Sequence, residues 1–127
     1  MDKLILIGFG GFIGSVMRYL VSGYVQTISR SNTFPYGTLA VNVIGSFIIG
    51  FLFYFIEIRS SLNPQMRALL LFGFLGAFTT FSTFSLETYN LLRSGELMPA
   101  LVNVGANCIL GVMAVWAGRT LPMMIWR

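Results

Sequence analysis

Residues 73–85 decide the fold of this chain, and they read GFLGAFTTFSTFS. They lie within residues 68–86, an uncharged apolar stretch that is long enough to cross a bilayer as a helix. Five of the seven residues in 79–85 nevertheless carry a hydroxyl group. Back-bonding to the carbonyl one turn earlier explains one or two such hydroxyls, but not five. We therefore predict a membrane-spanning helix that is broken near its middle, in the hydroxyl-rich segment just after Gly73 and Gly76, where exposed backbone carbonyls are suited to binding an ion.

The sequence contains three further apolar segments, two before this one and one after it. Residues 38–56 and 97–118 are uncharged and long enough to span a membrane. Residues 4–17 are uncharged but short, so the first helix must continue through Arg18, whose side chain then reaches a headgroup or a polar cavity. A signal peptide is the competing interpretation of this first segment, but its glycines and the three helices that cleavage would leave argue against it. We predict one four-helix transmembrane domain over 1–127, with helices at about 4–25, 37–57, 67–91 and 97–118.

Composition sets the class of protein independently of these segments. Only 9% of the 127 residues are charged, against roughly 25% in soluble domains, and 56% are hydrophobic. A chain this apolar is neither a soluble globule nor disordered. The single cysteine and the absence of histidine exclude an internal disulfide and leave no zinc or haem signature. The basic residues are scattered singly, so no nucleic-acid-binding face is expected.

Prolines and charges mark the connections and the topology. Pro35 and Pro64 fall in connections, Pro99 near the start of the last helix, and Pro122 is expected beyond its end. Five basic residues fall on the side of both termini and three, counting Arg18, on the other, which is a weak bias under the positive-inside rule. Two interpretations stay open: one orientation with the termini inside, or insertion in both orientations, which permits an antiparallel homodimer.

The polar side chains within the predicted helices have two interpretations each. Asn42 lies in the second helix, and Asn103 and Asn107 lie one turn apart in the fourth. These amides either join helices by hydrogen bonds or form a series of N–H donors for an anion. Phe81 and Phe84 share a helix face, where they either pack in the core or present their positive ring edges to a small anion.

Three ordered strings resemble the CrcB/Fluc fluoride channels. They are Gly10-Gly11-Phe12-Ile13-Gly14 leading to Arg18-Tyr19, then Pro35-Tyr36-Gly37-Thr38-Leu39-Ala40-Val41-Asn42, then residues 73–85 with Glu87. The third string at this distance after the second is highly specific. The fourth predicted helix matches in size and character alone.

The resemblance implies a channel and not an enzyme: an antiparallel, dual-topology homodimer in the cell (inner or plasma) membrane. It would conduct fluoride passively out of the cytoplasm, lower its toxicity and so confer fluoride resistance. By the family's pattern Phe81 and Phe84 line the fluoride path and Asn42 donates to the ion. Thr38, Ser82 and Thr83 are further members of the polar path. A structural Na⁺ at the dimer interface would be held by the backbone carbonyls of two positions in each subunit, Gly76 and Thr79.

Two departures from the pattern and two other functions complete the expectations. Ala77 stands where the family commonly has a second glycine, so the break is expected to be narrower or stiffer than usual. Gly111, Asn103 and Asn107 replace small hydroxyl residues, and no site is carried onto them. The alternatives are a proton-coupled exporter like the small multidrug transporters, for which Glu87 is the only deep carboxylate, and a non-transporting subunit of a membrane complex.

Overall fold

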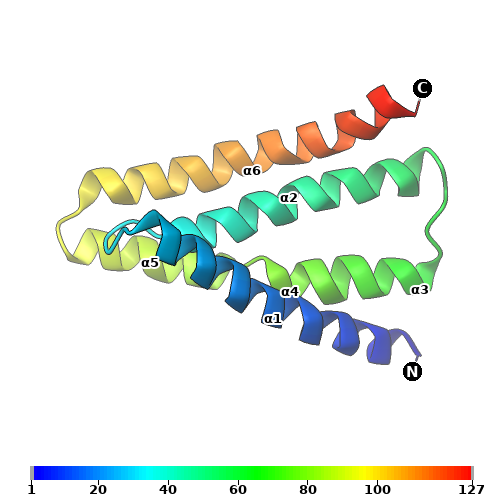
Figure 1. Cartoon of the computed structure of the whole chain (residues 1–127), viewed down its shortest axis with the longest axis horizontal. Coiled ribbons are helices and arrows are strands. Elements are labelled where there is room, and N and C mark those ends of the chain that lie inside the picture. The colour runs from blue at the N-terminus through cyan, green and yellow to red at the C-terminus, as the bar shows by residue number, and fades with distance from the viewer. Residues whose placement is uncertain (1, 127) are drawn as a thin grey trace.

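The computed structural model describes residues 2–126, and the regular structure in that range is entirely helical. Four helical segments are long and apolar enough to cross a membrane, which confirms the predicted all-helical class. They are α1 (Asp2–Ser29), α2 (Tyr36–Glu57), the composite third segment Pro64–Arg93, and α6 (Leu97–Ile125). Figure 1 shows that both ends of the chain lie at the same end of the bundle.

The third segment consists of four consecutive pieces. They are α3 (Pro64–Arg67), the π-helical η1 (Ala68–Leu75), α4 (Gly76–Phe78) and α5 (Phe81–Arg93). Asn63 begins the segment as an N-cap, because its Oδ1 accepts a hydrogen bond from the Met66 amide at 2.8 Å, and Pro64 occupies the first helical position. The predicted interruption therefore falls at residues 79 and 80, between α4 and α5.

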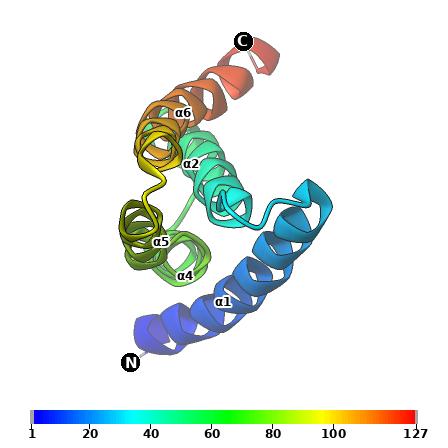
Figure 2. The same cartoon turned by 90° about the vertical axis from the view of Figure 1, so that its left-hand side faces the viewer.

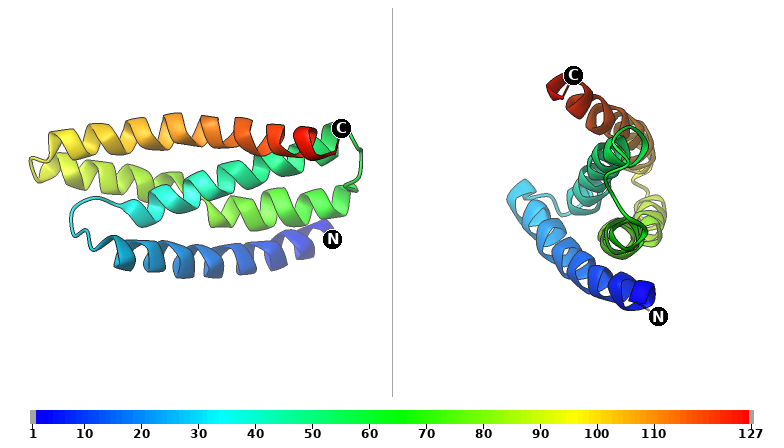
Figure 3. Two further views of the ribbon diagram at one scale, coloured as in Figure 1. Left: turned by 45° about the horizontal axis from the view of Figure 1, so that its top comes forward. Right: turned by 90° about the vertical axis from the view of Figure 1, so that its right-hand side faces the viewer.

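The break moves the third segment from one neighbour to another. Before the break, η1 and α4 pack against α1, whereas α5 beyond the break packs against α6. Figure 3 shows this shift: the chain passes from beside α1 to beneath α6 along its length. α2 packs mainly against α6, and Figure 2 shows this pair on the opposite side of α4 from α1. The break thus lies where the two halves of the bundle meet.

Glycines allow the close helix contacts that hold each half together. A Cβ at Gly10 or Gly14 of α1 would overlap the backbone carbonyl of Leu69 or Phe74, respectively, in η1. A Cβ at Gly118 of α6 would likewise overlap a backbone carbonyl of α2. These contacts are the packing role expected for small residues in membrane helices, where close approach replaces the hydrophobic effect as a source of stability.

The fourth helix is longer than the sequence predicted, and the placement of Pro122 was wrong. α6 continues to Ile125, so Pro122 lies inside it and is fully buried. A proline removes one amide donor and disturbs the preceding turn. Its cost is small here because the helix ends within a turn, where the Trp126 amide still donates to the Pro122 carbonyl at 2.8 Å.

Candidate functional site: the interrupted third helix

Two consecutive residues leave the helical conformation at the break. Thr79 has φ −88° and ψ 158°, and Thr80 has φ −151° and ψ 119°, so both are extended. The Thr79 amide still donates to the Leu75 carbonyl at 3.1 Å, which completes the last turn of α4. Thr80 then begins α5 as an N-cap, because its Oγ1 accepts from the Thr83 amide at 3.2 Å. The hydroxyl of Thr80 therefore starts the second half of the helix.

The break leaves backbone carbonyls without their helical donors. The Gly76 carbonyl would pair with the Thr80 amide in a continuous helix, but that amide donates to Asn42 Oδ1 at 2.9 Å. The Thr79 carbonyl would pair with the Thr83 amide, which is bound to Thr80 Oγ1 instead. Within residues 2–126 no hydrogen bond reaches either carbonyl. Both oxygens are thus available to a ligand, as the sequence predicted for this segment.

Asn42 of α2 stabilises the extended Thr80, because its side-chain amide pairs with the Thr80 backbone as a second peptide group would. Its Oδ1 accepts from the Thr80 amide, and its Nδ2 donates to the Thr80 carbonyl at 3.2 Å. The same Nδ2 donates to Asn107 Oδ1 of α6 at 2.9 Å. Both N–H bonds of the Asn42 amide are therefore engaged within the chain, and the three contacts join α2, α6 and the break.

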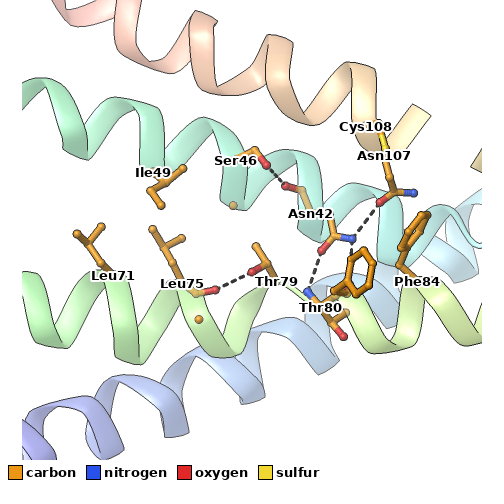
Figure 4. Close-up of a pocket in the computed structure, with 13 residues that line it drawn as sticks. Asn42, Ser46, Ile49, Leu71, Leu75, Thr79, Thr80, Phe84, Asn107 and Cys108 are labelled. Carbon is orange, nitrogen blue, oxygen red and sulfur yellow. Dashed lines mark hydrogen bonds between the residues drawn. The ribbon is translucent and has the colours of Figure 1, made fainter. Parts of the chain in front are cut away.

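A pocket of about 420 Å³ lies directly beside the break. Figure 4 shows Asn42, Thr79, Thr80, Phe84 and Asn107 gathered around it from α2, the third segment and α6. The other residues that line it are Gly45, Ser46, Ile49, Leu71, Leu75, Gly76, Phe81 and Cys108. The structure therefore brings Asn42, Gly76, Thr79 and both predicted phenylalanines into one site.

The two phenylalanines of this site differ greatly in exposure. Phe84 is 9% exposed, whereas Phe81 is 79% exposed, although their ring centroids are only 5.5 Å apart. The planes of the rings are inclined by 51° to each other. Phe81 thus projects from the surface of this chain at the pocket, and Phe84 forms part of its buried wall.

The remaining predicted site residues lie outside this pocket. The Thr38 hydroxyl donates to Glu87 Oε1 at 2.6 Å, and Glu87 lines a second pocket of about 370 Å³ near the α1–α2 connection. Ser82 and Thr83 are exposed on α5, and the Thr80 hydroxyl donates to Thr83 Oγ1 at 3.1 Å. Arg18 is partly exposed on α1 and lines neither pocket.

Asn103 and Asn107, to which no site was assigned, join the network at the break. The Asn107 Nδ2 donates to the Asn103 carbonyl at 2.9 Å and to Asn103 Oδ1 at 3.0 Å, and Asn103 is fully buried. Their spacing of four residues had indicated a shared helix face. Sequence alone gave no sign that this face meets Asn42, since α2 and α6 are far apart in the chain.

The donor chemistry at this site is neutral. Among residues 2–126 no group of three histidine, cysteine or acidic side chains is placed to hold a metal ion. The polar groups of the site are instead carbonyl oxygens, which suit a hard cation, and the N–H and O–H groups of amide and hydroxyl side chains, which suit an anion that displaces one of their acceptors.

The bundle spans the membrane, has an interrupted helix with freed carbonyls, and holds a pocket with asparagine and threonine side chains at the interruption. These features define the class of membrane proteins whose broken helices bind ions. Within this class the chain belongs to the CrcB-like protein, Camphor Resistance (CrcB), family, whose model matches residues 5–119. It is therefore a multi-pass membrane protein.

Curated relatives cover almost the whole chain. It is 45% identical over 119 residues to "Fluoride-specific ion channel FluC 1" of Methanosarcina acetivorans, covering 94% of this chain and 89% of the relative. It is 48% identical over 118 residues to "Fluoride-specific ion channel FluC" of Sulfurovum sp., covering 93% and 91%. The protein of the same name from Geotalea daltonii is 48% identical over 119 residues, covering 93% and 94%.

Proposed function

We propose that this protein is a fluoride-specific channel that lets fluoride leave the cytoplasm passively. The observation that carries the proposal is the pocket at the helix break, lined by Asn42, Phe81 and Phe84, in a chain whose relatives are named as fluoride-specific ion channels. A negative cell interior drives an anion outward through an open path without an energy source. Fluoride resistance follows from this efflux.

Neutral donors suit the conduction of a small, strongly hydrated anion. They replace the hydration shell without a fixed cation that would trap the ion. Both Asn42 N–H bonds are already engaged, so fluoride reaches this donor by displacing an acceptor, and Asn107 Oδ1 borders the same pocket. The edges of the Phe81 and Phe84 rings carry partial positive charge and complete the path. The hydroxyl groups of Ser82, Thr83 and Thr38 extend this path beyond the pocket.

The functional unit is an antiparallel homodimer with dual topology. Phe81 is 79% exposed beside the pocket, so within one chain the proposed ion path is open on the side of this ring, and a partner surface there would enclose it. A second copy of the chain supplies this surface, and the weak charge bias between the two sides permits both orientations.

A structural sodium ion at the dimer interface is the ligand best suited to the freed carbonyls. The residues fit such an ion, because Gly76 and Thr79 present neutral oxygens that no hydrogen bond from residues 2–126 satisfies. A bound cation would satisfy these oxygens and add a positive field beside the anion path. Purification with N-methylglucamine in place of sodium should abolish fluoride efflux, and readdition of sodium should restore it.

The proton-coupled exporter is not favoured, because the curated relatives of this chain are named as fluoride-specific ion channels. Fluoride efflux from proteoliposomes containing only this protein, followed with a fluoride electrode at an imposed potential, tests the proposed function. We expect fluoride release without chloride release. No fluoride release from well-formed proteoliposomes, or chloride release at an equal rate, would contradict the proposal.

A further inference from the structure

A single series of hydrogen bonds runs from α5 through α6 and α2 back to the break. It begins at the Phe84 carbonyl, which accepts from the Thr88 hydroxyl at 2.8 Å, and Thr88 Oγ1 accepts from Asn103 Nδ2 at 2.9 Å. The later bonds are those from Asn107 to Asn103, from Asn42 to Asn107, and between Asn42 and Thr80. The series connects the start of α5 with its own second turn by way of two other helices.

The groups at the two ends of this series, the Phe84 carbonyl and the Thr80 backbone, determine which atom donates in every hydrogen bond between them. The Thr88 hydroxyl hydrogen points to the Phe84 carbonyl, so its oxygen accepts from Asn103, whose Oδ1 then faces Asn107. Asn107 must turn its Nδ2 toward Asn103, where two acceptors lie, and its Oδ1 toward Asn42. The network thus assigns each amide orientation without ambiguity. No amide can flip without placing two oxygens or two N–H groups against each other.

We propose that Asn107 is the positioning residue of the helix break: it accepts the second N–H of Asn42 and so holds the Asn42 carboxamide against Thr80. Without Asn107 Oδ1 this N–H has no acceptor, and the carboxamide turns to find one. The Thr80 amide would then lose its acceptor, Asn42 Oδ1, and its protection from exchange with water. The importance of this role for conduction rests on the proposed function, but the hydrogen bonds that define the role do not.

Asn107 suits this role better than the other members of the series. Asn42 contacts Thr80 directly, so its loss would remove the pairing and not its orientation. Asn103 and Thr88 lie further from the break and act on it through Asn107 alone. Asn107 is also the one asparagine of α6 that lines the pocket.

The Thr80 amide reports this role directly, without any measurement of transport. Residues 79 and 80 are the only two consecutive threonines in the chain, so threonine labelled with ¹³C at the carbonyl and ¹⁵N at the amide gives one carbonyl-coupled amide signal, that of Thr80. Its hydrogen–deuterium exchange is measured in detergent micelles for the wild type and for Asn107→Leu. We expect the Thr80 amide to exchange about fivefold to tenfold faster in the variant. This ratio of rates corresponds to the net free energy of about one buried hydrogen bond.

Two further variants make the result decisive. Asn90→Leu is the matched control, because Asn90 is exposed on α5 and its side chain makes no hydrogen bond within residues 2–126; its Thr80 exchange should equal that of the wild type. If Asn107→Leu fails to fold, the isosteric Thr88→Val removes the far acceptor of the series and should raise Thr80 exchange about twofold. Unchanged Thr80 exchange in the folded Asn107→Leu protein, or in Thr88→Val where it replaces that variant, overturns the inference.

Fluoride efflux, measured after the same proteins are reconstituted into proteoliposomes, separates this inference from the proposed function. Unchanged Thr80 exchange with fluoride efflux intact would reject the role of Asn107 and leave the channel standing. Faster exchange in a protein that never conducts fluoride would do the reverse.

Discussion

The substitution Asn42→Leu removes the carboxamide that replaces a peptide partner at the break. Three polar atoms lose their partner: the Thr80 amide, the Thr80 carbonyl and Asn107 Oδ1. Thr80 is only 8% exposed, so water cannot replace these bonds freely. Each of these three orphaned groups costs about 1–3 kcal/mol, and the lower end applies where the chain relaxes around the group. We expect the free energy of unfolding to fall by about 3 kcal/mol.

Titration of SDS into dodecyl maltoside micelles, followed by tryptophan fluorescence, measures this change. The control is Ser46→Ala, one turn later on α2, whose hydroxyl donates to the Asn42 carbonyl at 2.7 Å in addition to the helical bond that this carbonyl accepts. Removing a redundant back-bond should cost less than about 0.5 kcal/mol. A loss below about 0.5 kcal/mol for Asn42→Leu as well would refute the reasoning that Asn42 holds the break open.

Three further substitutions test the path, the packing and the rival mechanism. Phe81→Ile and Phe84→Ile should each slow fluoride efflux while size-exclusion chromatography still shows the assembled protein, and normal flux in both would return the rings to a packing role. Gly10→Ala places a Cβ onto the Leu69 carbonyl and should destabilise the protein by about 1–3 kcal/mol in the same SDS titration, whereas Gly8→Ala, which meets nothing within 4 Å, should not; equal effects would disprove the close contact with η1. Glu87→Gln keeps an oxygen acceptor for the Thr38 hydroxyl and should keep fluoride efflux that is independent of a pH gradient, whereas loss of all transport would point to a proton-coupled exporter.

The break was predictable because its signal is local. Five hydroxyls in residues 79–85, just after Gly76, conflict with a continuous helix in lipid, and the structure places two extended residues there. The four apolar helices were equally predictable, because the thickness and the apolar interior of the bilayer set their length and composition. Features that depend on one segment of the sequence are thus the ones that the sequence predicted.

What the sequence did not predict depends on contacts between distant segments. The π-helical geometry of Ala68–Leu75 has no residue pattern of its own, and it occurs where Gly10 and Gly14 bring α1 against the backbone. The partnership of Asn42 with Asn107 requires α2 and α6 to lie side by side, which no spacing in the chain reveals. The same limit applies to the freed carbonyls. The sequence predicted the segment in which they lie, but it did not predict that the Thr80 and Thr83 amides bind other acceptors.

The proposed sodium ion and the proposed dimer depend on each other through the same atoms. In the bilayer an unsatisfied carbonyl is costly, and Asn42 relieves this cost only for Thr80. The carbonyls of Gly76 and Thr79 in one chain are too few to coordinate a cation, but a symmetric pair of chains supplies twice as many. An ion that binds only the pair must stabilise the pair by mass action, so lowering the sodium concentration should weaken the dimer as well as the flux.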